Sequence, residues 1–268
     1  MSKPRGRCIF CGGGNLSKEH IFPEWIQGVL GKKFSHTTHK AVRNPKYEWE
    51  ESHSKQRQGD PLTRKLFIVC KTCNNEWMSE LQAKAKPILS PLLLGNWSDL
   101  APEDIVILSA WIAMTDNVME YADRLTVTLD EASRAAFMRL RIPPAHWEIW
   151  AARFDDLQDR YFIHTAMGFQ GLGIETGEAV EQGMHINTIC IGKVAFLVYT
   201  GAERLGLSCN PEYMTQRGYF PIWPIAGSLV SPRITVSMVD ARSVHTTLFK
   251  ELCPDGDDLP PIDPVVTL

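Results

Sequence analysis

Two pairs of cysteines, each with two residues between them, place the strongest constraint on the fold of this chain. The first pair is Cys8 and Cys11, and the second pair is Cys70 and Cys73. Four thiolates in two Cys-x-x-Cys pairs are a frequent ligand set for tetrahedral zinc, with Zn–S distances of about 2.3 Å. The segment between the pairs is longer than the ~15–20 residues of a simple zinc ribbon, so the site should enclose an insertion. The spacing therefore predicts a structural zinc site that stabilises a small N-terminal domain.

Cysteine use and apolar runs indicate the compartment. The chain has seven cysteines, an odd number, and four of them form the two pairs. This composition favours a reducing cytoplasm over a framework of disulfides, and Cys190, in an apolar run typical of a strand, should be a core residue. The segment 1–7 is basic and leads into a cysteine instead of an apolar run. No run reaches the ~18 apolar residues of a membrane span. We therefore expect a cytoplasmic protein without a signal peptide or a membrane partner.

Charge is distributed unevenly along the chain, although the formal net charge is only −3. Residues 1–90 contain 16 Lys and Arg against 8 Asp and Glu, whereas residues 91–268 contain 12 against 23. A basic part joined to an acidic part favours contact of the first with phosphates, while the second keeps the chain soluble or repels DNA elsewhere. The alternative is a solvated basic surface that binds no ligand.

Proline and glycine at Pro91, Gly95 and Pro102 indicate a linker, which predicts a zinc-stabilised domain over 1–95 and a larger domain over 96–268. The elements expected in the first domain are strands over 16–22 and 63–69, a helix over 23–30 stopped by Gly31, and a long loop or loose hairpin over 32–60. A further helix should follow Cys73, with Asn74 or Asn75 as its cap, and Pro87 should kink or end it.

The larger domain should be α+β, with helices packed on an antiparallel sheet. Its expected elements are helices over 105–121 and 130–140, the second ended by Pro143-Pro144, and strands over 146–154, 160–169, 185–191 and 193–200, with a tight turn at Ile191-Gly192-Lys193. The nearly all-apolar helix 105–121 should be buried, with Trp111 and Met114 in the core. The glycine-rich stretch 168–183 does not lead from a strand into a helix as a dinucleotide-binding motif does, so it predicts a loop.

Within the insertion, Glu19 and His20 place a carboxylate and an imidazole side by side. Hydrolysis of a phosphodiester requires a base to activate water and a cation to neutralise the phosphate. An imidazole suits the first task, and a carboxylate oxygen suits Mg²⁺ or Mn²⁺. Neighbours on a regular strand point to opposite faces, so both can act on one phosphate only if the strand bends or the phosphate lies across its end. A third group is expected at the start of the helix after Cys73, where free N–H groups favour phosphate.

Together these motifs resemble the HNH endonucleases, which have a ββα-metal fold of the treble-clef type. The matching pattern is Cys-x-x-Cys, then Glu19-His20-Ile21-Phe22-Pro23, then Cys-x-x-Cys-Asn opening a helix, and it covers residues 8–90. Trp25, Gly59-Asp60-Pro61 and Asn74-Asn75-Glu76-Trp77-Met78 resemble a bacterial and phage subgroup of that family.

The resemblance implies a role for each matching residue. Cys8, Cys11, Cys70 and Cys73 would hold structural zinc. His20 would be the general base, Glu19 and Asn74 would bind a catalytic Mg²⁺ or Mn²⁺, and the substrate would be DNA. For Asn74, capping of the helix is the alternative. The middle asparagine of the family motif has no counterpart within 62–69. Asp60 and Asn44 are the candidates to substitute for it.

Basic side chains near these motifs are expected to bind DNA phosphates. They are Lys18, Lys32, Lys33, Arg64, Lys65 and Lys71. Of the other histidines, His36, His39 and His53 either line a metal or DNA site or face solvent, while His146, His164, His185 and His245 are far apart in sequence and indicate no function. The main alternative to a nuclease is a non-catalytic zinc module that binds nucleic acid or a protein. A thiol redox protein is disfavoured, because neither cysteine pair lies in a βαβ pattern. The 96–268 domain is a candidate surface for a homo-oligomer or a protein partner.

Overall fold

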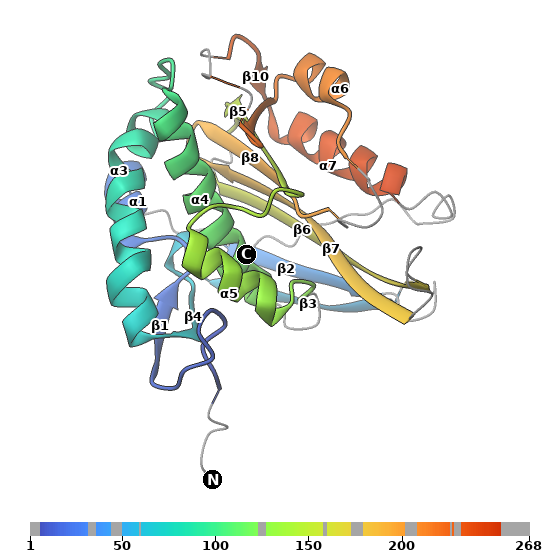
Figure 1. Cartoon of the computed structure of the whole chain (residues 1–268). Helices are drawn as coiled ribbons and strands as arrows, with labels where there is room; N and C mark the ends of the chain where they lie inside the picture. Colours follow the sequence, from blue (N-terminus) through green and yellow to red (C-terminus); the bar gives the residue numbers. More distant parts are fainter. Residues whose placement is uncertain are drawn as a thin grey trace.

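The computed structural model describes residues 6–31, 36–43, 50–58, 60–122, 127–157, 160–172, 179–201, 208–225, 227 and 232–252. It is a mixed α/β protein in which a central sheet lies between helices on its two faces (Figure 1). The helical elements are α1 (Glu24–Leu30), η1 (Pro61–Thr63), α2 (Lys71–Cys73), η2 (Asn74–Met78), α3 (Ser79–Leu93), α4 (Pro102–Met119), η3 (Glu120–Ala122), α5 (Glu131–Leu140), α6 (Pro211–Gln216) and α7 (Met238–Leu252). The strands are β1 (Leu16–His20), β2 (His36–Arg43), β3 (Glu50–Gln58), β4 (Lys65–Cys70), β5 (Glu148–Phe154), β6 (Arg160–Leu172), β7 (Ala179–Ile191), β8 (Val194–Tyr199), β9 (Phe220–Trp223) and β10 (Thr235–Val236).

The central sheet has the order β10-β5-β8-β7-β6, and β9 also pairs with β5. All pairs are antiparallel except β10 with β5, which confirms the expected antiparallel sheet with helices. Successive side chains of a strand point to opposite faces. In β8, therefore, Phe196 and Val198 belong to one buried cluster, and Leu197 and Tyr199 belong to the other. Both faces are apolar because helices cover both.

Helix α4 lies on one face of this sheet and is buried on almost every side (Figure 1). Trp111 and Met114 are fully or almost fully buried, which confirms the core positions expected from the sequence. On the opposite face α7 packs through Ala241, Val244 and Leu248 against the strands. Cys190 is also buried in that second cluster, as expected.

The N-terminal elements place two antiparallel strands before one helical stretch. Strand β1 pairs with β4, and the chain then runs through α2, η2 and α3 without a break. The helix begins one residue after Cys70, whose Sγ accepts a hydrogen bond from the Cys73 N–H, so the expectation that Asn74 or Asn75 caps it was wrong.

The helix also continues past Pro87, which lies inside α3, so the expectation that it could end there was wrong. An interior proline costs a helix about 3 kcal/mol, because it removes one hydrogen bond and crowds the preceding turn. Burial of Leu89, Leu92 and Leu93 offsets this cost, since each buried leucine side chain contributes about 1.5–3 kcal/mol. Tertiary packing thus extends the helix beyond its local signals.

The strands within 32–60 and 168–183 are longer than the sequence analysis predicted. Residues 36–43 and 50–58 pair as the antiparallel hairpin β2–β3, which is the hairpin alternative for 32–60. The loop expected over 168–183 was wrong for 168–172 and 179–183, because β6 and β7 pair from Arg160↔Ile191 out to Leu172↔Ala179, and residues 173–178 lie outside the described part of the chain. Ladder hydrogen bonds come from the backbone, so glycines do not prevent pairing once neighbouring strands fix the register.

One buried cluster spans both sides of the predicted boundary near residue 95. It includes Phe10 and Trp77 from the N-terminal part, and Phe137 and Ile189 from the C-terminal part. The turn between β7 and β8 adds a second connection, because the Lys193 N–H donates to the carbonyl of Leu93 at 3.0 Å. The division into two domains stays a prediction.

We expect Gly192→Ala to lower the free energy of unfolding by about 2–3 kcal/mol. Gly192 has a φ of 58°, and a Cβ there would lie 2.5 Å from the Leu93 carbonyl oxygen and 2.8 Å from Leu30 Cδ2. The matched control is Gly28→Ala inside α1, where an added Cβ meets no atom within 4 Å. That change should leave stability equal or raise it by up to ~1 kcal/mol. Urea denaturation measures both, and equal stabilities would contradict the docking of this turn.

Candidate zinc centre and the adjoining acid–imidazole hollow

The sulfur atoms of Cys8, Cys11, Cys70 and Cys73 converge on one point. All four lie within 4.8 Å of one another, and the Sγ atoms of Cys11 and Cys70 are 3.5 Å apart. Four sulfurs at about 2.3 Å from a zinc ion in a tetrahedron are separated by ~3.8 Å, so this cluster is compatible with zinc. In the part of the chain that the structure describes, no other group of three or more His, Cys, Asp or Glu ligand atoms converges in this way.

Backbone N–H groups around the cysteines are directed at two of the four sulfur atoms. Gly12 has a φ of 69°, and its N–H donates to the carbonyl of Cys8 at 2.9 Å, closing a tight turn. The N–H of Gly13 donates to Cys11 Sγ at 3.4 Å, and the N–H of Cys73 donates to Cys70 Sγ at 3.4 Å. Donors directed at sulfur stabilise the charged thiolate, which is the ligand form.

Aromatic side chains pack around the first cysteine pair. Phe10, between the two ligands of that pair, has its ring 5.0 Å from that of Trp77 and 6.4 Å from that of Phe137. The guanidinium of Arg141 lies over the Trp77 ring at 4.3 Å. Because Phe137 belongs to α5, the C-terminal part of the chain contributes directly to the surroundings of the four-cysteine cluster.

Beside the cysteines lies a hollow of about 340 Å³. Its lining residues are Lys18, Glu19, His20, Pro23, Glu24, Trp25, Asn74 and Gln82. The three residues that the sequence predicted as an acid–base and cation site, Glu19, His20 and Asn74, are therefore brought together. The register of β1 with β4 shifts between Ser17 and Glu19. Such a bulge bends the strand pair, and a bend is what the adjacent residues Glu19 and His20 need to reach the same hollow.

Glu19 and His20 differ in burial and in partners. Glu19 is only 4% exposed, and burial raises the pKa of its carboxyl to about 7. His20 Nε2 lies 3.2 Å from Glu24 Oε1, which Lys65 Nζ also approaches to 3.6 Å. Burial and the charge of Lys65 lower the pKa of His20, against the opposing effect of Glu24. The imidazole is therefore neutral at pH 7 and able to accept a proton.

The Asn74 side chain is oriented by β1. Its Nδ2 donates to Ser17 Oγ at 3.2 Å, and Ser17 Oγ donates in turn to the carbonyl of Val69 at 3.3 Å. This bond uses an amide hydrogen and leaves Oδ1, the atom that can bind a cation, outside it. Asn74 thus lies in the first turn of the helical stretch without capping it.

Asp60, one candidate for the missing asparagine, does not line the hollow. It is buried, its Oδ1 accepts from the Leu62 N–H at 3.0 Å, and it forms an ion pair with Arg160 of β6. Four residues further on, the carbonyl of Arg64 accepts from the Ile21 N–H at 3.0 Å, next to His20. The other candidate, Asn44, lies outside the described residues.

The basic residues expected to bind DNA occupy different surroundings. Lys18 lines the hollow, Lys65 pairs with Glu24, and Lys71 is exposed. Arg64 Nη2 donates to the carbonyl of Ala122 at 2.8 Å, so this guanidinium also serves the fold. Lys32 and Lys33 lie outside the described residues. DNA contact by this set stays a prediction.

Sequence reasoning missed Glu24 and His185. Glu24 follows His20 by four residues, and that spacing next to a helix start was the available signal. His185 is fully buried and binds carboxylates that are far away in the sequence, so no local pattern could have indicated it.

Comparisons of the chain with models of protein families, with curated proteins and with solved structures returned no match. Within the described ranges, no helix combines the length and the apolar character needed to cross a membrane. The function of this site has to be inferred from its own residues.

Proposed function

We propose that this protein is a metal-dependent endonuclease of the HNH type that hydrolyses DNA. One observation carries the proposal: Glu19, His20 and Asn74 line a single hollow directly beside the four-cysteine cluster. A carboxylate, a neutral imidazole and an amide oxygen are the groups that metal-assisted phosphodiester hydrolysis requires.

The order of elements supports a treble-clef, ββα-metal fold for residues 8–90. The first cysteine pair precedes β1, the second pair ends β4 and opens the helical stretch, and β1 pairs with β4. Zinc on the four cysteines would fix the ends of both strands and the start of the helix, as structural zinc does in small domains. The hollow then lies between β1 and the first helical turn.

In the proposed reaction each side chain has one task. His20 accepts a proton from the attacking water, which its lowered pKa allows at neutral pH. Glu19 and Asn74 supply oxygen ligands of the kind that Mg²⁺ or Mn²⁺ prefers. The bound cation would neutralise the phosphate and stabilise the leaving oxygen. Glu24 orients His20 through the 3.2 Å contact between Oε1 and Nε2. Lys18, at the edge of the same hollow, supports the binding of a phosphate.

We expect His20→Ala to lower the rate of plasmid cleavage by about 10²–10⁴-fold, the usual contribution of a general base. The assay uses purified full-length protein with Mg²⁺ or Mn²⁺, a chelator control and zinc content by elemental analysis. The matched variant is His146→Ala, which also exchanges an imidazole for a methyl group but lies outside the hollow. Loss of cleavage in His20→Ala alone, at equal zinc content, is the expected result. Equal cleavage by both variants would contradict the assignment of the base.

A non-catalytic zinc module that binds nucleic acid is the second candidate. Two observations favour it: Glu19, His20 and Glu24 line the same hollow without converging as one ligand group, and His20 Nε2 already pairs with Glu24. The same assay separates the candidates. Zinc-loaded wild-type protein that binds DNA but cleaves none with any divalent cation would favour the binding module.

A further inference from the structure

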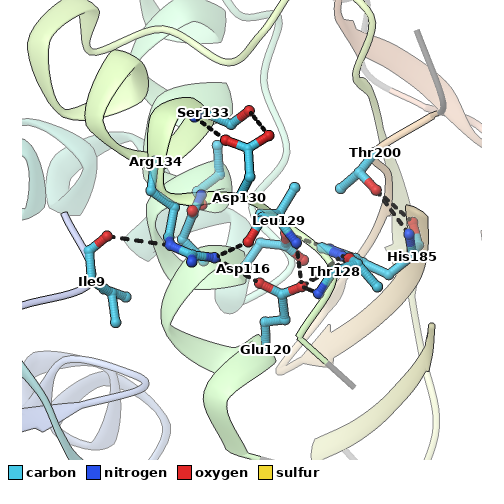
Figure 2. Close-up of polar contacts among 12 residues, drawn as sticks. Ile9, Asp116, Glu120, Thr128, Leu129, Asp130, Ser133, Arg134, His185 and Thr200 are labelled. Atoms are coloured by element: carbon cyan, nitrogen blue, oxygen red, sulfur yellow. Dashed lines mark hydrogen bonds and ion pairs between the residues drawn. The ribbon is translucent and has the colours of Figure 1, made fainter. Parts of the chain in front are cut away.

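A second polar cluster is buried between α4 and the central sheet (Figure 2), and none of its residues lines the hollow. Asp116, Glu120 and His185 are fully buried, and Arg134 of α5 is 4% exposed. His185 Nε2 lies 2.7 Å from Asp116 Oδ2, and His185 Nδ1 lies 3.5 Å from Glu120 Oε1. Arg134 Nη1 lies 3.6 Å from Glu120 Oε2. Removing one member of a buried ion pair leaves the other charge uncompensated. Loss of any one of these charged groups is therefore expected to destabilise the fold through the others.

Hydrogen-bond directions assign the charges. The Thr128 hydroxyl donates to Glu120 Oε1 at 2.8 Å, so it accepts from His185 Nδ1 at 2.9 Å. His185 Nε2 faces a carboxylate, which only accepts. Both ring nitrogens therefore donate, and His185 is an imidazolium. Two carboxylates then face two cations, and the buried cluster is neutral.

Arg134 connects this cluster to the first cysteine pair. Its Nε donates to the carbonyl of Ile9 at 3.2 Å, and its Nη1 donates to the carbonyl of Leu129 at 2.5 Å. Ile9 directly follows the ligand Cys8, and its own N–H donates to the carbonyl of Ile68 at 2.9 Å. The peptide inside the first pair is thus held on one side by β4 and on the other by Arg134.

We propose that Arg134 is a positioning residue for the zinc centre. It holds the first cysteine pair in ligand geometry by joining the Ile9 carbonyl to the buried Glu120–His185–Asp116 cluster. Zinc retention by ligands in the first 73 residues would therefore depend on side chains from α4, α5 and β7. The proposal concerns the zinc centre alone and holds whether or not the hollow cleaves DNA.

The test measures the rate at which zinc leaves the folded full-length protein for a chromophoric chelator. Arg134→Met keeps the length of the side chain but removes its donors, and we expect zinc release at least about tenfold faster, the usual effect of losing a partner around a metal ligand set. Arg134→Lys retains one donor group and should give an intermediate rate. Glu120→Gln removes the anion behind Arg134 and should also accelerate release. These two milder variants carry the test if Arg134→Met does not fold.

The matched control is Ser109→Ala, which removes another buried hydrogen-bonding group. Its hydroxyl lies 2.7 Å from the carbonyl oxygens of Ile105 and Ile222, and neither bond involves Arg134 or a residue of the cysteine pairs. Urea is added so that wild type and variants are compared at equal free energy of unfolding. Faster release from the Arg134 variants than from Ser109→Ala under these conditions supports the proposal. Equal rates at matched stability, or a wild-type protein that holds no zinc, would overturn it.

Discussion

Cys73→Ser is expected to abolish zinc binding and to unfold the region around the two cysteine pairs. Structural zinc contributes about 10–16 kcal/mol of apparent binding free energy in small zinc domains, as much as the ~5–15 kcal/mol by which a whole domain is stable. Here Cys8, Cys70 and Cys73 belong to the same buried cluster as Phe10 and Trp77, so loss of the metal would also loosen this aromatic packing. Zinc content by elemental analysis should fall from one per chain to nearly none. Peptides covering 8–22 and 65–78 should lose protection in hydrogen exchange.

Cys190→Ala is the control for losing a buried thiol away from this cluster. Its sulfur lies among the side chains under α7, so the variant should keep its zinc and lose only about 1–2 kcal/mol. Wild-type zinc content and normal exchange protection in Cys73→Ser would contradict a four-cysteine zinc centre. A loss of zinc with unchanged protection would show that the metal is bound but does not stabilise the fold.

The unfolding free energy is expected to fall as pH rises from about 6.5 to about 10, because in this range the folded state keeps the His185 proton and the unfolded state loses it. Burial alone would lower the pKa of His185, but the carboxylates of Asp116 and Glu120 outweigh it and raise this pKa to about 10. A histidine whose pKa is higher in the folded state stabilises the fold fully below its unfolded value of 6.5, and this stabilisation is lost as pH approaches the folded value. The slope should approach ~1.4 kcal/mol per pH unit.

The contribution of the same cluster to folding stability is also lost at low pH, when Glu120 becomes protonated. Burial would raise the pKa of Glu120, but its close contact with His185 and the charge of that imidazolium, with the N–H groups of Thr128 and Leu129, lower it to about 2. A carboxyl with a depressed pKa stabilises the fold above its unfolded value of 4.5 and loses this effect as pH falls toward 2. A further titratable group, His164, lies beside the cluster, with its ring 5.1 Å from that of His185.

His185→Gln should remove the decline at alkaline pH, and urea denaturation at about pH 6 and about pH 9 measures it. His245→Gln is the control, since this second buried histidine has the opposite shift. Burial, helped by the charge of His164, lowers the pKa of His245 to about 3, and hydroxyls of Thr165 and Thr188 bind its ring. Its stabilisation is present above 6.5 and is lost toward acid. An alkaline slope that survives in His185→Gln would show that His185 is neutral in the folded protein.

Local patterns were sufficient for most elements and for the four-cysteine cluster. The two Cys-x-x-Cys pairs, the apolar helix around Trp111 and the turn at Gly192 all depend on neighbours within one or two helical turns or one hairpin. The grouping of Glu19 and His20 with Asn74 was also predictable, because the cysteine pairs on either side bring β1 to the start of the helix. Metal ligands act over long sequence separations, so their spacing carries tertiary information.

The wrong expectations share a physical cause. A glycine-rich stretch pairs as strands β6 and β7, and α3 continues through Pro87 and Pro91, because pairing partners and buried neighbours outweigh local propensity. The pairing strand of β6 or β7 cannot be identified from the residues of that strand alone. The side chains that pack against α3 likewise cannot be identified from the residues of α3.

Cysteine spacing and apolar periodicity alone were enough to predict a zinc-compatible cluster and an antiparallel sheet covered by helices. The charge pairing of the core depended on the tertiary structure. His185 and Asp116 are 69 residues apart, and Arg134 and Ile9 are 125 residues apart. A salt bridge or a side-chain hydrogen bond has no period along the chain, so it becomes visible only when packing has placed α4, α5 and β7 against one another and against the first cysteine pair.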